Sequence, residues 1–346
     1  MQYFLTGSYS GTNEPGIKLW QFNPADGSLT EKAGAKGVER PSYLTFHPAG
    51  EIFIACSETA GGELVSWRFG LAAETLSEIS RQPSNGDHPA HASIDESGKW
   101  LLSVNYSGGN VNVFPLQEGG VIGALADSAN HEGSGLNSQR QDAAHPHSVS
   151  QIPGTPLFLV PDLGLDKIHV YKLDGRNGKL ERQRTIETAP GAGPRHVAFH
   201  PFRKIFYVLE ELSSSLVVYG IGEGADIDKL QAVPLVPDGW QGGNTSAEVA
   251  VSENGKFLYA SNRGHDSIAA FSVEEDGTLK SLGFAKTGGK GPRHFVLPPG
   301  GGWLIAANEN SGSLTVLKID ETGMPKLHGK TVQTKAPVCV KYAGTR

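Results

Sequence analysis

A repeated unit of about 40 to 50 residues organises this sequence and limits what the chain can fold into. The clearest copy runs from Gly193 to Tyr219 and reads as a strand, a turn that contains proline, a second strand, a polar loop and a third strand. Apolar and polar residues alternate along these short strands, which is typical of half-buried antiparallel sheets. Related copies follow Arg40, His88, His145, Ser246 and Gly291, and a partial copy follows Ala336.

The partial copy at the C-terminus supplies only a first strand, and its missing strands are found at the other end of the chain, at Met1–Tyr9 and Ile17–Phe22. Segments that begin at Gly27 and Gly277 read as a turn followed by a fourth strand. We therefore predict an all-β fold, a seven-bladed β-propeller with four-stranded antiparallel blades, closed by pairing of the N- and C-terminal strands. Residues 1–346 are expected to form one domain, and the 45 glycines and 21 prolines suit its many tight turns.

Composition argues against several classes of partner. The net charge of −6 gives no support for binding to nucleic acid or to an anionic membrane.

Cys56 and Cys339 lie far apart in apolar runs, which predicts buried thiols in a reducing compartment. No leader pattern and no membrane-spanning apolar run is visible, so we expect a cytoplasmic protein, a monomer or weak homo-oligomer.

The register of the repeat predicts a site. His147, Arg195 and Arg293 occupy the same position in three units, just before the first strand. Glu211 and Arg263 follow the ends of second strands. Antiparallel pairing brings these two positions together, so we expect them at one mouth of the central channel. Further candidate contacts to the substrate are Arg140, Asn105 and Asn262.

A polar, Gly/Ser-rich insertion at residues 126–144 leads directly into His145 and His147, which favours a covering loop with a functional role. A zinc site formed by His131, His145, His147 and Asp142 is an alternative, but a flexible loop fixes tetrahedral ligands poorly. We predict no metal and no cofactor, since no phosphate-binding glycine loop is present either.

Several arginines around a carboxylate and an imidazole suit a small anionic ligand with acid–base chemistry beside it. The alternative is that arginine–glutamate pairs between blades are structural. His47 and His200 are interpreted as turn residues. By strand alternation, His196 and His294 are expected to point away from the arginines and to pack or support the site.

The sequence resembles the seven-bladed propeller lactonases, a family that includes propeller-type 6-phosphogluconolactonases and fungal carboxy-cis,cis-muconate cyclases. The motifs that carry the resemblance are His131-Glu-Gly-Ser-Gly, Arg140-Gln, His145-Pro-His-Ser148, Pro161-Asp-Leu-Gly164, Gly191-Ala-Gly-Pro-Arg-His196, Glu211-Leu-Ser-Ser214, Ser261-Asn-Arg-Gly264 and Pro292-Arg293.

The resemblance implies His147, Arg195 and Glu211 as catalytic residues, with Arg263 as an anion contact. It also implies hydrolysis of a small anionic lactone, 6-phosphogluconolactone in the first interpretation. The alternative enzyme is a muconate-type lactone cyclase. A non-catalytic binding scaffold is less favoured, because scaffold propellers present aromatic or apolar faces. Either Glu211 or His147 could act as the base.

Overall fold

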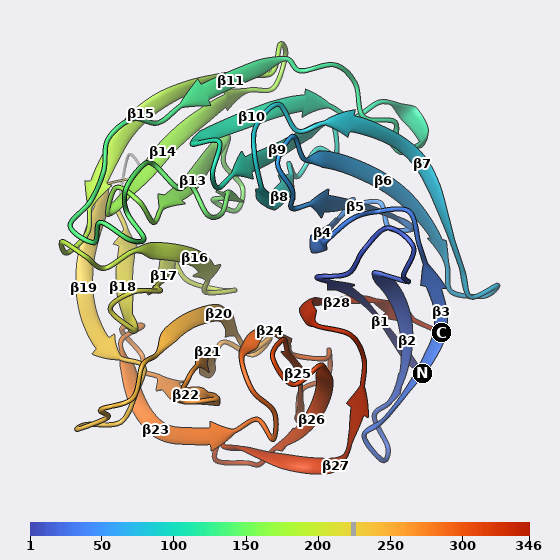
Figure 1. The fold of residues 1–346 in the computed structure, drawn as a ribbon. Coiled ribbons are helices and arrows are strands. Elements are labelled where there is room, and N and C mark those ends of the chain that lie inside the picture. The colour runs from blue at the N-terminus through green and yellow to red at the C-terminus, as the bar shows by residue number, and fades with distance from the viewer. Residues whose placement is uncertain (223–225) are drawn as a thin grey trace. The chain divides into compact units, whose positions relative to one another are not determined.

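The computed structural model describes residues 1–222 and 226–346. These residues form seven four-stranded sheets with antiparallel pairing, and one short 3-10 helix, η1 (Glu118–Gly120) (Figure 1). The all-β prediction with four-stranded units is confirmed. By its internal contacts the chain divides into two compact units: unit 1 contains residues 1–22, 30–193 and 341–346, and unit 2 contains residues 23–29 and 194–340.

Three sheets belong wholly to unit 1. The first is ordered β4 (Pro41–Phe46), β5 (Ile52–Ser57), β6 (Glu63–Gly70), β7 (Thr75–Pro83). The second is ordered β8 (Pro89–Ile94), β9 (Trp100–Asn105), β10 (Asn110–Pro115), β11 (Asp127–Asn130). The third is ordered β12 (Ser150–Gln151), β13 (Leu157–Asp162), β14 (Lys167–Asp174), β15 (Lys179–Glu187).

Three further sheets belong to unit 2. The first is ordered β16 (Pro194–Phe199), β17 (Ile205–Glu210), β18 (Ser215–Ile221), β19 (Ile227–Pro234). The second is ordered β20 (Thr245–Val251), β21 (Phe257–Arg263), β22 (Ser267–Val273), β23 (Leu279–Lys286). The third is ordered β24 (Pro292–Val296), β25 (Trp303–Asn308), β26 (Ser313–Ile319), β27 (Pro325–Gln333).

The seventh sheet joins the two ends of the chain, as the sequence predicts. Its order is β28 (Pro337–Thr345), β1 (Gln2–Ser8), β2 (Ile17–Asn23), β3 (Ser28–Ala35). Within unit 1, the ammonium group of Met1 donates to the carbonyl of Arg346 at 2.8 Å, and the Arg346 amide donates back to Met1 at 3.0 Å. The termini therefore close this sheet through reciprocal hydrogen bonds.

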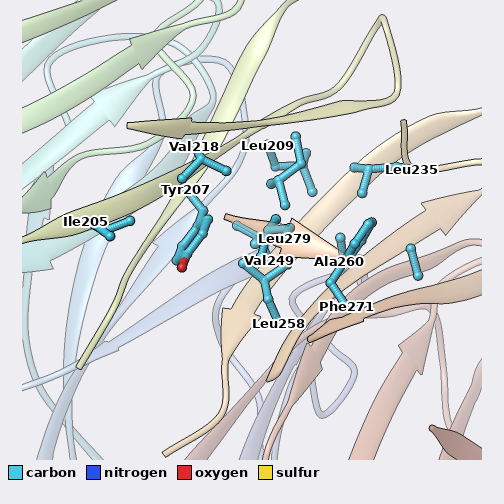
Figure 2. Packing of buried hydrophobic residues seen from close by; sticks show 12 residues of the cluster. Ile205, Tyr207, Leu209, Val218, Leu235, Val249, Leu258, Ala260, Phe271 and Leu279 are labelled. Atoms are coloured by element: carbon cyan, nitrogen blue, oxygen red, sulfur yellow. The ribbon is translucent and has the colours of Figure 1, made fainter. Parts of the chain in front are cut away.

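Burial along the strands explains the packing of unit 2. All six residues of β17 are buried, whereas β19, the last strand of the same sheet, has only exposed and half-buried residues. Ile205, Tyr207 and Leu209 share one face of β17 and pack against the next sheet, on Val249 and neighbouring residues (Figure 2). The period of two along β17 thus fills a core between adjacent sheets.

A β-bulge recurs near the start of the first strand in several sheets. In β16, Pro194 pairs with Glu210 while His196 pairs with Leu209, so the register shifts at Arg195, the extra residue of the bulge. The same register shift occurs in three other first strands, where the extra residue of the bulge is Arg293 in β24, Ala90 in β8 and Ser42 in β4. A bulge disrupts the alternation of a strand and re-aims side chains, so each first strand presents one residue at this end in a special orientation.

Two further predictions from the sequence concern the cysteines and the insertion at residues 126–144. Cys56 and Cys339 are buried free thiols, as the sequence predicts. The 126–144 segment is not a loop throughout, because residues 127–130 form β11 and pair with β10. The sequence of this edge strand, Asp-Ser-Ala-Asn, lacks an apolar pattern, which is why it was not recognised. Among the described residues no helix is long and apolar enough to cross a membrane.

Candidate active site

Glu211 lies at the centre of a buried ionic cluster in unit 2. It follows the last residue of β17, where the chain turns towards β18. Its Oε2 atom lies 2.8 Å from Nε of Arg195 and 2.9 Å from Nη2 of Arg263. The side chains of Glu211 and Arg195 are each only 3% exposed. One buried carboxylate oxygen therefore holds two guanidinium groups from two neighbouring sheets.

Arg195 reaches this cluster from the bulge of β16, and several protein groups hold it there. Besides Glu211, its Nη1 donates to the carbonyl oxygen of Ala247 and lies 3.2 Å from Nε2 of His196. Burial lowers the pKa of Arg195 from its usual 12.5 to about 10, and the charge of Glu211 opposes this shift. Arg195 consequently remains a cation at neutral pH.

Arg263 is the last residue of β21 and supports the same carboxylate. Its Nη2 donates to the carbonyl of Ser246 at 3.2 Å, which anchors it to β20. Burial also lowers the pKa of Arg263, and the charges of Glu211 and Arg293 act in opposite directions on it. The two guanidiniums are thus fixed by backbone carbonyls as well as by Glu211, an arrangement that pre-orients donors for an oxygen anion.

Arg293 occupies the same bulge position in β24 but is more accessible. Its Nη1 lies 3.6 Å from Oε2 of Glu309, and the two side chains are 18% and 24% exposed. Arg293 contributes to the electrostatic surroundings of both Arg195 and Arg263. A partly exposed guanidinium with a loose ion pair is suited to exchanging its carboxylate for an anionic ligand.

Glu248 adds a second buried carboxylate that the sequence did not suggest. Its Oε2 atom lies 3.1 Å from Nδ1 of His196 and 3.0 Å from Nε2 of His294. All three side chains are buried. Both histidines were expected to point away from the arginines, but the bulge places His196 against Arg195. Together with Glu309, the ionic cluster of unit 2 contains three arginines and three glutamates. The sequence had predicted several arginines around a single carboxylate.

His147 belongs to unit 1, where it is buried and its amide donates to the carbonyl of Pro161 at 2.9 Å. The Tyr106 ring packs edge-on against His147, with centroids 5.4 Å apart, and stacks on His145 at 4.3 Å. His145 also contacts Asp142 at 3.2 Å. The backbone of His147 is therefore fixed by β13, and its imidazole packs against the Tyr106 ring.

Asp162 fastens the returning end of the insertion to the sheet. Its Oδ1 accepts the backbone N–H groups of His145, Gly164 and Leu165, and its Oδ2 lies 2.6 Å from Nδ1 of His131. His131 in turn reaches the Tyr171 hydroxyl at 2.9 Å. Asp162 thus fixes the backbone two residues before His147.

Gln141 and Asp166 join the insertion to the segment that leads towards Arg195. The buried Gln141 amide donates to Oδ1 of Asp166 at 2.7 Å. The carboxylate of Asp166 also accepts the amides of Gly191 and Gly193, at 2.6 and 2.8 Å. Sequence reasoning missed both residues. The spacing of the repeat was the available signal for Asp166. Asp166 lies four residues after Asp162, as Asp266 lies four residues after Asn262. Asp266 accepts the amide of Gly291 in the same way.

The remaining candidates differ in accessibility. Asn262 is fully buried and its amide bonds to Ser246 and Leu235 within unit 2. Asn105 is equally buried in unit 1 and donates to Ser84 and Asn110. These contacts organise strand ends, and neither Asn105 nor Asn262 is part of the proposed substrate contacts. Arg140 is half-buried on the insertion and stays a candidate.

The histidines considered for zinc do not form one group. Among the described residues, the ligand atoms of His131, Asp162 and His169 lie within 4.8 Å of one another. However, His131 already uses one ring nitrogen towards Asp162 and the other towards Tyr171. Burial, with the nearby His131, lowers the pKa of His169 to about 3. We interpret this group as a hydrogen-bonded part of the core.

Comparison with known proteins identifies the family. Residues 3–342 match the family described as lactonase, 7-bladed beta-propeller, and the chain therefore belongs to it. It is 34% identical to a 6-phosphogluconolactonase of Bacillus subtilis over 97% of both chains. The family establishes the seven-bladed propeller as the fold and lactone hydrolase as the class of enzyme.

Solved structures agree with this assignment. A periplasmic gluconolactonase of Pseudomonas aeruginosa superposes with a TM-score of 0.95 at 30% identity, covering 99% of both chains. A putative 6-phosphogluconolactonase of Bacteroides fragilis superposes with a TM-score of 0.91 at 28% identity, over 99% of this chain and 97% of the other. Because one of these proteins is described as periplasmic, the cytoplasmic location stays a prediction from the sequence.

Proposed function

We propose that this enzyme hydrolyses 6-phosphogluconolactone to 6-phosphogluconate. The observation that carries the proposal is the pair of guanidiniums, Arg195 and Arg263, fixed on one oxygen of Glu211 in a member of the lactonase family. The B. subtilis relative, which aligns over nearly its whole length, supports this choice of lactone.

Hydrolysis of a lactone develops negative charge on the carbonyl oxygen when water attacks. A fixed cation beside that oxygen lowers the barrier, because it need not reorganise as the charge develops. Arg195 suits this role, since Glu211, His196 and the Ala247 carbonyl restrain its guanidinium before substrate binds. We assign the oxyanion contact to Arg195.

Arg263, Arg293 and Arg140 are the candidates for holding the phosphate. Bidentate pairing with a guanidinium is the geometry by which arginine recognises phosphate and carboxylate groups. Arg293 is the most favourable in unit 2, because its ion pair with Glu309 is long and partly exposed. Arg140 lies on the insertion, in unit 1.

Water must lose a proton and the leaving alkoxide must gain one. Oε2 of Glu211 already forms ion pairs with two guanidiniums, so we assign Glu211 to aligning them. His147 then takes the proton-transfer role, for which an imidazole is suited near neutral pH. The sequence predicts this role for His147, and a His147→Asn variant tests it independently of the arginine cluster.

The decisive experiment measures ring opening of freshly prepared 6-phosphogluconolactone by the purified protein, with gluconolactone and a muconate-type lactone as competing substrates. The expected result is hydrolysis well above the spontaneous rate, which is lost in Arg195→Ala and Glu211→Ala. Arg81→Ala is the matched control, because Arg81 is also paired with two carboxylates, Glu63 and Glu78, but on the partly exposed β7.

Two outcomes would contradict the proposal. Faster turnover of gluconolactone or of the muconate-type lactone would overturn the substrate assignment. Activity that survives both cluster substitutions would show that the chemistry takes place elsewhere.

A further inference from the structure

His196 connects Arg195 to a second carboxylate. Its Nε2 lies 3.2 Å from Nη1 of Arg195, and its Nδ1 lies 3.1 Å from Oε2 of Glu248. The three residues come from β16 and β20, whose strands pack against each other. They therefore form a continuous hydrogen-bonded chain between two sheets of unit 2.

The chemistry of these groups fixes the direction of each hydrogen bond. A guanidinium can only donate, so Nε2 of His196 must accept from Arg195. A neutral imidazole that accepts at Nε2 carries its proton on Nδ1, and that N–H then donates to Glu248. The geometry is consistent with only this order of donors and acceptors along the chain.

Glu248 is itself held in place. Its Oε1 accepts the amide of Val249 at 3.2 Å, and its own amide donates to the hydroxyl of Ser261 at 3.0 Å. Nε2 of His294, from β24, lies 3.0 Å from Oε2 of the same carboxylate. The acceptor for His196 is thus anchored by backbone and side-chain contacts from three strands.

We propose that His196 and Glu248 are positioning residues that fix the orientation of the Arg195 guanidinium. The inference rests on the lactonase function proposed above. A single ion pair through Nε allows the guanidinium to tilt, whereas a second contact at Nη1 defines its plane. Glu211 supplies the first restraint, and His196 with the Ala247 carbonyl supplies the second. A donor fixed in this way stabilises the oxyanion without reorganisation.

The test by activity uses two substitutions at the same position. His196→Gln keeps an amide oxygen near the place of Nε2, and His196→Phe keeps the size of the ring but has no acceptor. We expect the phenylalanine variant to lose about 10- to 100-fold in kcat with KM little changed, because a misplaced donor weakens only the transition state. The glutamine variant should recover most of this loss.

His200→Gln is the matched control. His200 is another buried histidine, directly after the end of β16, where Nε2 lies 3.1 Å from the carbonyl oxygen of Gly255 and does not contact Arg195 or Glu248. Its kcat should equal that of the unchanged enzyme. Wild-type kcat in His196→Phe, or equal losses of kcat in the phenylalanine and glutamine variants, would overturn the proposal.

The test by spectroscopy needs no substrate and so separates this inference from the proposed function. Protein labelled with ¹⁵N-histidine should show His196 as the neutral tautomer with its proton on Nδ1. In Glu248→Leu, which removes the acceptor, this tautomer should no longer dominate. A His196 proton on Nε2 in the unchanged protein would overturn the positioning role, even if the lactonase assay succeeds. Absence of lactonase activity with the expected tautomer would instead contradict the proposed function.

Discussion

The first strands β16 and β24 begin with the same three residues, Pro-Arg-His, each preceded by a glycine, and both carry the same bulge, yet their arginines lie in different surroundings. The Arg195 side chain is 3% exposed and bonds to Glu211, His196 and a backbone carbonyl. The Arg293 side chain is 18% exposed and forms a 3.6 Å ion pair with Glu309. Local sequence therefore sets where a guanidinium lies, and neighbouring sheets determine how firmly it is held.

This difference suggests a division of labour. A restrained arginine is suited to stabilising charge that develops during the reaction, whereas an accessible one is suited to binding a charged group of the substrate. The following substitutions test whether the two strands really differ in this way, in order of decreasing expected effect.

Arg195→Lys should have the largest effect. Lysine keeps the charge but lacks the planar fork that contacts Glu211 and His196 together. We expect kcat to fall by about 100- to 1,000-fold, in the range seen when one oxyanion donor is removed. Steady-state kinetics on 6-phosphogluconolactone measures this. The equivalent Arg293→Lys should retain most of its kcat, and similar losses of kcat in both variants would remove the distinction between the strands.

Glu211→Gln should lower both activity and stability. The substitution leaves two buried guanidiniums without their shared anion, and breaking a buried ion pair in this way costs about 3 to 5 kcal/mol. Denaturant unfolding should show this loss, and kcat should fall with it. Glu309→Gln, at the exposed pair, is the control and should change the free energy of unfolding by less than about 1 kcal/mol. Equal losses of stability would show that burial does not distinguish the pairs.

Arg293→Gln should affect binding more than chemistry. We expect KM for 6-phosphogluconolactone to rise by about 10-fold, which corresponds to the loss of one charge-assisted contact, while kcat changes little. Gluconolactone lacks the phosphate, so its KM should be unaffected. A rise in KM for both lactones would indicate that Arg293 contacts the ring instead.

The smallest effect is expected from the carboxylates that hold the glycines before each arginine. Asp166 accepts from Gly191, Gly193 and Gln141, whereas Asp266 accepts from Gly264 and Gly291. Replacing Asp266 by alanine should cost about 1 kcal/mol of stability, and replacing Asp166 somewhat more. Thermal unfolding of both variants measures the difference. A larger loss for Asp266 would contradict the order inferred from their contacts.

Much of this architecture could be predicted from the sequence because it depends on repetition. Alternating strands and recurrent turns gave the number of sheets, and the shared register brought Arg195, Glu211 and Arg263 to adjacent strand ends. The second strand of each repeat is short and largely apolar, so local pattern was sufficient there.

The parts that could not be predicted depend on contacts across sheets. The direction of the His196 side chain was misjudged because strict alternation fails at a bulge, and no residue in Pro-Arg-His marks the extra position. Glu248, Gln141 and Asp166 look like ordinary polar residues in the sequence. Their importance appears only when Glu248 meets histidines from two strands, and when Asp166 meets glycines far along the chain.

The reciprocal bonds between Met1 and Arg346 have a practical consequence for protein engineering. Because the two ends meet at 2.8 and 3.0 Å, a short peptide linker could join them, and new ends could be opened at the exposed turn residues 175–177. Such a circular permutant would keep the seventh sheet as one uninterrupted chain. An affinity tag fused directly to Met1 removes the terminal ammonium group from this contact, so an internal tag within residues 175–177 disturbs the structure less.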